Sequence, residues 1–229
     1  MAGIQDYFEF TDDFFGGGTF GTSASENDPW VVADTSTSGT PTYTRVDGAA
    51  TGEAALDLAS TSEVENVCLS FGDTLCIDID KVQGCEFRVK MNQATLDSAS
   101  QVAVGLIGDR NDAIDSVAQA ALFRVVGSDS TTSVVVESDD GTNDNDDKAT
   151  GQTLVNAYKR LRIDFSNGTS DVRFFMDDAN GSLTRVASST TFDMSNYTGS
   201  LQPVIQLQKT ADTNTDGVTV DYVKVWGTR

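Results

Sequence analysis

Histidine is absent from this chain of 229 residues. Without imidazole, the chain cannot build the Ser-His-Asp or Cys-His arrangements of nucleophilic hydrolases, and it lacks a common nitrogen ligand for metals. The sequence also contains no cysteine-pair zinc pattern and no Gly-rich loop before a helix that would hold a phosphate. These absences exclude most hydrolytic mechanisms and the usual phosphate-binding motifs.

Cysteine and long apolar runs are also scarce. The three cysteines, Cys68, Cys76 and Cys85, are odd in number, and two of them lie in runs typical of strands. Small, buried, unpaired side chains fit this pattern better than a disulfide framework. No run approaches the ~18 apolar residues that cross a bilayer. Residues 1–15 have neither the basic nor the apolar region of a secretory signal, so we expect synthesis in the cytoplasm.

Basic residues are outnumbered throughout the chain. There are 15 Lys and Arg against 35 Asp and Glu, which gives a formal net charge of −20 that is spread along the whole sequence. A surface of this charge repels DNA, RNA and anionic lipid, so we expect neither nucleic acid nor membrane as a partner. High net charge also keeps proteins dispersed whatever they do, so charge alone assigns no function.

Alternation of apolar and polar residues is the strongest pattern that is present. Residues 85–92, Cys-Glu-Phe-Arg-Val-Lys-Met-Asn, place all their apolar side chains on one face, which predicts a half-buried strand. Residues 160–165 and 172–176 repeat the pattern on either side of Asn167-Gly168, which predicts a hairpin. Further strands are predicted at 75–79, 102–107, 121–126, 133–137, 203–208 and 218–226.

Helical patterns are nearly missing, and residues 113–121 predict at most a short turn. About ten strands separated by Gly, Asn, Asp and Ser indicate an all-β protein. Its length is ordinary for a sandwich that folds as one domain.

The first residues are unusually aromatic around a glycine triplet. Six aromatic side chains flank Gly16-Gly17-Gly18: Tyr7, Phe8, Phe10, Phe14, Phe15 and Phe20. One interpretation is an N-terminal arm, residues 1–10, that precedes a sandwich domain, 11–229, and anchors it to a neighbouring subunit through Ile4, Tyr7 and Phe8. The other is that these aromatic residues form the first strand and contact the core of their own domain.

Two segments carry a resemblance to a known fold. Residues 10–15, Phe-Thr-Asp-Asp-Phe-Phe, are followed by Trp30, and residues 218–226 read Val-Thr-Val-Asp-Tyr-Val-Lys-Val-Trp. These segments resemble the concanavalin A-like jelly roll of LamG domains, pentraxins and family-16 glycosidases. In that superfamily, the corresponding first and last strands lie together. The resemblance implies a jelly-roll β-sandwich of two antiparallel sheets with very little helix. Residues 201–209 also resemble stretches of tailed-phage virion proteins that use this fold.

The catalytic motif of the family-16 enzymes, Glu-x-Asp-x-x-Glu on one strand, is absent. A glycosidase needs two carboxyl groups that face each other across the sugar. The nearest candidates, Glu63 and Glu65, are followed by no acidic residue at the required spacing. A solvated loop or a strand edge explains them better, and we expect no enzymatic activity.

One segment resembles the first half of a calcium loop. Oxygen-bearing side chains recur at alternate positions before Gly217: Asp212, Asn214 and Asp216. Position twelve, which is Glu in an EF-hand, would be Val223, so a calcium ion would need carboxylates from another loop. The acidic run 138–147 could supply them, or it could form a solvated loop tip. The alternative to a calcium site is a polar turn before the last strand. No other cofactor is indicated.

Two functions from different classes fit these patterns. The acidity, the aromatic N-terminus and the virion-like C-terminal third favour a capsid decoration protein that binds the outside of the major capsid shell. Its partners would be the major capsid protein or other virion subunits. It would be made in the host cytoplasm and would form a homo-oligomer, with a trimer as one form. The alternative is a carbohydrate-binding module of a phage tail fibre or another adhesin, for which the chain offers two Trp and five Tyr. Trp226 is predicted to belong to the core.

Overall fold

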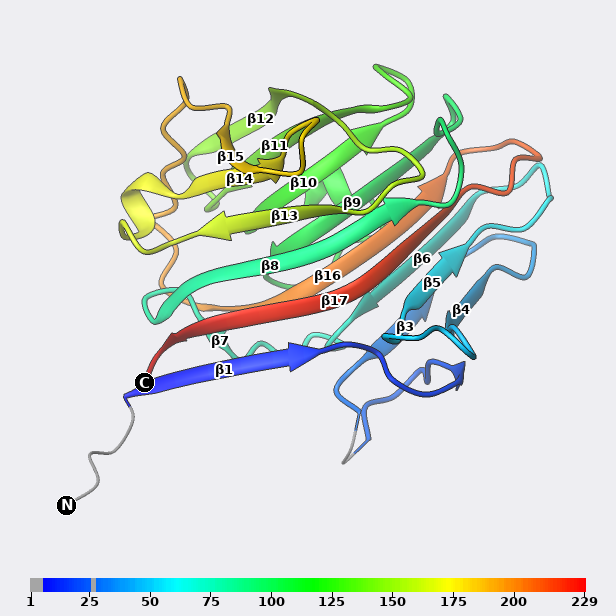
Figure 1. Ribbon diagram of the computed structural model, residues 1–229, viewed down its shortest axis with the longest axis horizontal. Coiled ribbons are helices and arrows are strands. Elements are labelled where there is room, and N and C mark those ends of the chain that lie inside the picture. The colour runs from blue at the N-terminus through cyan, green and yellow to red at the C-terminus, as the bar shows by residue number, and fades with distance from the viewer. Residues whose placement is uncertain (1–5, 26–27) are drawn as a thin grey trace.

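Two antiparallel sheets pack face to face in the computed structural model, which describes residues 6–25 and 28–229 (Figure 1). Helix within these ranges is limited to two short 3-10 turns, η1 (Ile114–Ser116) and η2 (Thr169–Asp171). The predicted all-β jelly-roll sandwich is therefore confirmed. No helix in the described ranges is long and apolar enough to cross a membrane.

The front sheet, which faces the viewer in Figure 1, has the strand order β15-β14-β13-β8-β17-β5-β4-β2, and β1 also pairs with β17. Its strands are β1 (Tyr7–Asp12), β2 (Gly18–Thr19), β4 (Thr42–Arg45), β5 (Ala54–Asp57), β8 (Val82–Met91), β13 (Lys159–Asp164), β14 (Arg173–Asp177), β15 (Leu183–Val186) and β17 (Gly217–Thr228).

The back sheet has the order β12-β11-β10-β9-β16-β6-β3, and β7 pairs with the start of β16. Its strands are β3 (Val31–Asp34), β6 (Glu65–Ser70), β7 (Ile77–Asp78), β9 (Ser100–Ile107), β10 (Ala120–Val126), β11 (Ser133–Asp139), β12 (Asp144–Thr153) and β16 (Ser200–Lys209).

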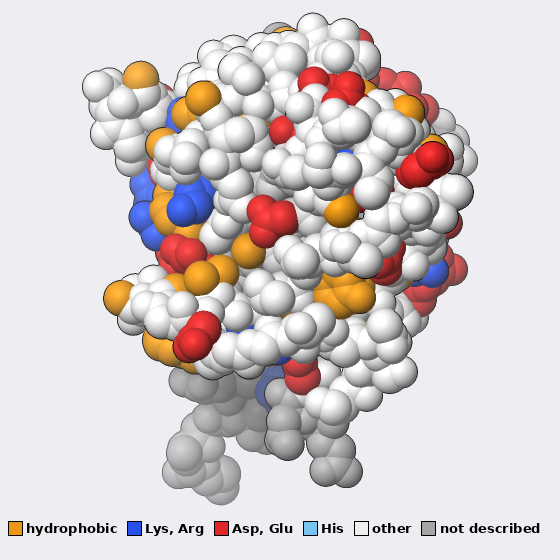
Figure 2. Space-filling view, turned by 90° about the vertical axis from the view of Figure 1, so that its right-hand side faces the viewer, with side chains coloured by type: hydrophobic (Ala, Val, Ile, Leu, Met, Phe, Trp, Pro, Cys, Tyr) orange, Lys and Arg blue, Asp and Glu red, His pale blue; other side chains and the backbone are white. Residues whose placement is uncertain are grey.

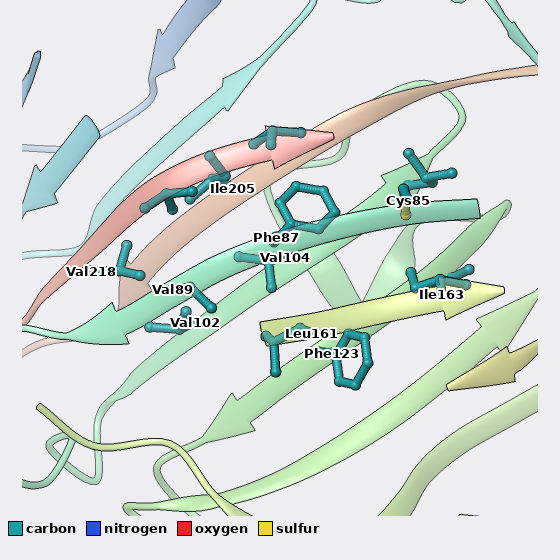
Figure 3. Packing of buried hydrophobic residues seen from close by; sticks show 14 of the residues in the cluster. Cys85, Phe87, Val89, Val102, Val104, Phe123, Leu161, Ile163, Ile205 and Val218 are labelled. Carbon is teal, nitrogen blue, oxygen red and sulfur yellow. The ribbon is translucent and has the colours of Figure 1, made fainter. Parts of the chain in front are cut away.

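Apolar side chains at alternate positions of the strands fill the space between the sheets. Phe87 and Val89 of β8 and Leu161 of β13 lie in one buried cluster with Val104 and Phe123 of the back sheet (Figure 3). Burial of each such side chain stabilises the fold by roughly 1.5–3 kcal/mol. The predicted strand 85–92 and the hairpin 160–176 are confirmed as β8 and as β13 with β14.

All three cysteines are unpaired, as predicted, but only two of them are buried. Cys68 and Cys85 are buried, whereas Cys76 is exposed. Burial raises the pKa of the Cys85 thiol, so this group stays a neutral, apolar part of the core.

The first strand belongs to the sandwich. Residues 7–12 form β1 and pair with the last residues of β17, so the expected boundary after residue 10 falls inside a strand. Phe10 packs edge-on against Phe71, and the buried Phe14 lies 5.3 Å from Trp30 between ring centroids. The alternative interpretation, in which the aromatic residues contact the core of their own domain, therefore holds for Phe10 and Phe14, whereas Phe15 is exposed. Ile4 lies outside the described residues.

The acidic run 138–147 is largely strand rather than loop. It contains the end of β11, a tight turn and the start of β12. β12 pairs only with β11 at the sheet edge, so it needs no apolar alternation, and its charges protect an edge from pairing with another chain. In the turn, Asp140 accepts hydrogen bonds from the amides of Thr142, Asn143 and Asn196. Burial opposes these bonds, but together they lower the pKa of Asp140 to about 2.

Candidate functional site

The outer face of the front sheet is the most distinctive surface of the molecule. Figure 2 views the sandwich from one end and shows Lys and Arg side chains gathered in a hollow at the left, on the front-sheet side. Seven of the 15 basic residues alternate with core residues on these strands and so point out of this face: Arg88, Lys90, Arg160, Arg162, Arg173, Arg185 and Lys224. Nearly half of the basic residues of this acidic chain thus lie on one face of one sheet.

A row of opposite charges crosses the three central strands. Glu86 on β8 lies opposite Arg162 on β13 and opposite Lys224 on β17. Nε and Nη2 of Arg162 are 2.7 and 2.6 Å from Oε2 of Glu86, and the Tyr222 hydroxyl donates to Oε1 at 2.6 Å. Burial and this bond to Glu86 raise the pKa of Tyr222, which keeps the phenol protonated. The network holds its side chains in one arrangement.

An aromatic ring lines a second hollow of this face, near the start of β8 and the end of β17, at the end of the sheet away from the viewer of Figure 2. Five side chains line its volume of about 260 Å³: Tyr7, Glu86, Arg162, Lys224 and Trp226. The Trp226 ring centroid is 5.6 Å from the Arg162 guanidinium carbon and 6.0 Å from the Lys224 ammonium nitrogen. Both distances lie within cation–π range. Trp226 is partly exposed and lines the hollow, so part of its indole is accessible from solvent.

Glycine on the neighbouring strand makes room for this indole. Gly84 lies opposite Trp226, and a Cβ at position 84 would be only 2.5 Å from Cζ2 of the indole. On the other side, Glu9 accepts hydrogen bonds from the Tyr7 hydroxyl at 2.6 Å and from the Lys224 ammonium at 2.9 Å. These two donors lower the pKa of Glu9.

A β-bulge turns the last strand so that its aromatic residues face outward. The pairing of β17 with β8 shifts register between Val220 and Tyr222, so Asp221 and Tyr222 both lie on the outer face. Asp221 pairs with Arg88. Bulges re-aim side chains in this way beside functional sites. The prediction that Trp226 belongs to the core is wrong for this reason. The sequence does contain a signal for the bulge, because the buried valines fall on even positions at 218 and 220 and on odd positions at 223 and 225.

A second aromatic position lies on the same face. Tyr158 stacks with Arg88 and Lys90, whose cationic groups are 4.4 and 4.7 Å from its ring centroid. Its hydroxyl donates to Glu53 at 2.5 Å, and burial together with this bond raises the pKa of Tyr158. The face therefore repeats one motif, an aromatic ring beside two cations.

The residues of the predicted calcium loop are used differently. Oδ1 of Asp212 accepts from the Asn214 amide at 3.0 Å, and Oδ2 of Asp216 accepts from the Asp97 amide at 3.1 Å. The fully buried ammonium of Lys209, at the end of β16, donates to the Asn214 carbonyl at 3.2 Å, so a cation already bonds the backbone of the loop. Across residues 6–25 and 28–229, no three Cys, Asp or Glu side chains gather as a metal cage. Calcium binding through Asp212, Asn214 and Asp216 therefore stays a prediction, and these internal contacts weigh against it.

Glu63 and Glu65 have separate environments. Glu63 is exposed, as expected, but Glu65 is fully buried in β6, an interior strand, so a solvated location is wrong for Glu65. It accepts hydrogen bonds from the Ala59 amide at 2.7 Å and the Thr61 hydroxyl at 2.5 Å, and it lies 3.7 Å from Lys209. Glu65 therefore stabilises the fold beneath the loop that precedes β17.

The predicted anchoring residues are only partly placed. Tyr7 is 41% exposed and lines the hollow, whereas Phe8 is half-buried against the core. Ile4 is outside the described ranges, so anchoring through the three residues stays a prediction.

Comparison with known proteins gives the fold. No family model and no curated protein matches the chain. Among solved structures, the Emp47p carbohydrate recognition domain matches with 10% identity and a TM-score of 0.55 over 90% of this chain and 91% of that one. The fold is a concanavalin A-like jelly roll.

Two further structures share this jelly roll. The apo Crh5 transglycosylase has 16% identity and a TM-score of 0.53 over 95% of this chain and 83% of that one. A protein of unknown function, SO2946 from Shewanella oneidensis MR-1, has 7% identity and a TM-score of 0.56 over 98% and 88%. At these identities the likeness shows the fold alone.

Proposed function

We propose that this protein is a non-enzymatic carbohydrate-binding module and that the hollow outer face of the front sheet is its binding surface. The observation that carries the proposal is the partly accessible Trp226 ring, which is surrounded by the fixed polar groups of Arg162, Glu86 and Lys224. An aromatic ring packs against the apolar face of a sugar, while a few fixed donors and acceptors meet its hydroxyl groups. Groups already held in place lose little entropy on binding.

The charge on this face favours a hydroxyl-rich ligand over a protein. Lys, Glu and Asp are depleted in protein–protein interfaces, although Arg is enriched there, and here Glu86 and Lys224 lie at the centre of the sheet. A saccharide can exchange hydrogen bonds with such ion pairs without separating them. The name of the Emp47p domain shows that this fold serves carbohydrate recognition in another protein, which makes the proposal compatible with the fold.

Carboxylates on the face are occupied by guanidinium groups, which supports a non-enzymatic role. Glu86 pairs with Arg162, Asp177 with Arg160, and Asp221 with Arg88. Glycoside hydrolysis requires one carboxyl group that donates a proton and a second that attacks or activates water. The Crh5 transglycosylase shares the fold, so the fold itself permits catalysis; the ion pairing argues against it in this chain.

A saccharide screen tests this function. The full chain is applied to an array of glycans, and hits are titrated by calorimetry. We expect binding that is lost in Trp226→Ala and retained in Phe15→Ala, because Phe15 is 69% exposed but does not line the hollow. The proposal is overturned if no glycan binds, or if Trp226→Ala binds as the parent protein does.

A second candidate is the capsid decoration protein, favoured by an apolar hollow elsewhere. This hollow has a volume of about 360 Å³ and adjoins the first strand; it is lined by Phe10, Ala24, Pro29, Phe71, Thr74 and Cys76. Exposed apolar surface of this kind is typical of protein interaction sites. We propose that it contacts the major capsid protein on the outside of a virus particle, with the protein as a homo-oligomer such as a trimer.

Particle binding tests the second candidate. Purified protein is added to particles that lack it, and occupancy is compared between the parent chain and Phe10→Asp, after calorimetry has shown that the variant folds. Occupancy that falls only in Phe10→Asp would support attachment through the apolar hollow. Absence of the protein from purified particles would refute a virion role without affecting carbohydrate binding.

A further inference from the structure

We infer that the hollow at Trp226 recognises an acidic saccharide, one that carries carboxylate or sulfate groups on its rings. The inference rests on the proposed carbohydrate-binding function and names the ligand class of the same site. It follows from the position of the cations. The Arg162 guanidinium carbon and the Lys224 ammonium nitrogen lie over the Trp226 ring, 5.6 and 6.0 Å from its centroid, so a sugar that contacts the exposed part of the indole meets both cations.

Both cations keep donors for a ligand. Arg162 directs Nε and Nη2 to a single oxygen of Glu86, and Lys224 bonds Glu9. A guanidinium has five N–H donors and an ammonium has three, so each side chain can donate hydrogen bonds to a second anion in addition to its carboxylate partner. The side chains of Arg162 and Lys224 are each 38% exposed, which leaves these donors open to solvent.

The motif of an aromatic ring with two cations occurs twice on this face, which suits a ligand made of several linked sugars. Gly84, opposite Trp226, is four residues from Arg88, which stacks on Tyr158. At ~3.3 Å per residue, the two aromatic positions are roughly 13 Å apart along β8. Each has two cations beside it. An oligosaccharide with regularly spaced anionic groups matches this repeat, whereas a neutral one would offer only hydroxyl groups to the donors that the carboxylates of the face leave free.

The net negative charge of the chain does not prevent an anion from binding to this face. The whole chain carries a formal charge of −20, which repels anions at long range. On the hollow face, however, the basic side chains are balanced against the carboxylates that pair with them. An acidic sugar therefore meets a nearly neutral surface that presents fixed cationic donors. Direct contacts between a charged donor and an anion are among the stronger hydrogen bonds.

A matched pair of ligands tests the inference. The full chain is titrated by calorimetry with a uronic acid oligosaccharide and with the same oligosaccharide after its carboxyl groups are reduced to alcohols. We expect the acidic form to bind at least about tenfold more tightly, and the difference to shrink as salt is raised. A sulfated oligosaccharide forms a third arm, which separates carboxylate from sulfate recognition.

Variants locate the preference on named residues. Arg162→Gln and Lys224→Gln should each lower affinity for the acidic form by about tenfold and lower affinity for the reduced form by less, because Gln keeps a hydrogen-bond donor for hydroxyl groups but not the charge. Arg162→Lys and Lys224→Arg keep the charge and guard against loss of folding, which is checked by thermal melting. Lys148→Gln, on β12 of the back sheet, is the control.

The outcomes separate the inference from the proposed function. Equal affinity for the acidic and reduced forms would overturn the acidic preference and leave carbohydrate binding intact. If neither form binds and no other glycan binds, the proposed function itself is overturned. A preference that survives in both Gln variants would show that the anion is recognised elsewhere.

Discussion

The buried pair of Glu65 and Lys209 gives the most quantitative test of the packing. Both side chains are fully buried, and the Lys209 ammonium also donates to the carbonyls of Ala59 and Asn214 at 2.5 and 3.2 Å. Lys209→Met removes the cation and leaves a buried carboxylate without its partner. Breaking a buried pair in this way typically costs about 3–5 kcal/mol. For a domain of this size, that lowers the melting temperature by roughly 6–20 °C.

The double variant Glu65→Gln, Lys209→Met is the informative control. It removes both charges, so it should recover much of the stability lost in the single variant, because the uncompensated carboxylate is gone. Urea unfolding of the parent chain and of both variants measures the difference. A loss below about 1 kcal/mol in Lys209→Met would refute the reasoning, since the pair would then contribute like an exposed one. A double variant that is as unstable as Lys209→Met would also refute the reasoning.

Three further predictions follow from individual contacts. Gly84→Ala should displace the Trp226 indole and weaken saccharide binding while thermal melting shows an intact fold, because a Cβ at 84 would lie 2.5 Å from the ring. If binding is unchanged, the ring does not depend on that gap. The lowered pKa of Asp140, about 2, stabilises the fold above pH ~4, and this stability is lost as pH falls through 2. Asp140→Asn should therefore cost about 1–2 kcal/mol at neutral pH and almost nothing near pH 2; an equal cost at both pH values would contradict it. Calcium should leave the melting temperature of the parent chain unchanged relative to chelator, because the ammonium of Lys209 already bonds the backbone of the loop. A rise that disappears in Asp216→Asn would restore the calcium hypothesis.

Strand patterns predicted most of the sandwich because alternation and burial are coupled wherever one face of a strand meets the core. β8 and the hairpin of β13 with β14 were found in this way. β12 escaped prediction because an edge strand needs no apolar face. The burial of Glu65 was also hidden from the sequence, since its partner Lys209 lies far along the chain.

The candidate site was harder to predict than the fold. Its charged row joins three strands that are distant in sequence, so the register between them, and not any local motif, brings Glu86 between Arg162 and Lys224. Trp226 was assigned to the core because the bulge at Asp221, which reverses the face of the following residues, was not anticipated. Tyr7 was singled out as an anchoring residue, and its place in the lining of the hollow was not predicted.

Tryptophan fluorescence during titration with a saccharide tests the central claim most directly. The chain has two tryptophans; Trp30 is 1% exposed in the core, so a ligand that stacks on the hollow face should perturb Trp226. We predict a saturable change in emission with the parent chain and none with Trp226→Phe at the same ligand concentrations. A saturable change that persists in Trp226→Phe, or binding detected by calorimetry without any change in emission, would contradict the account.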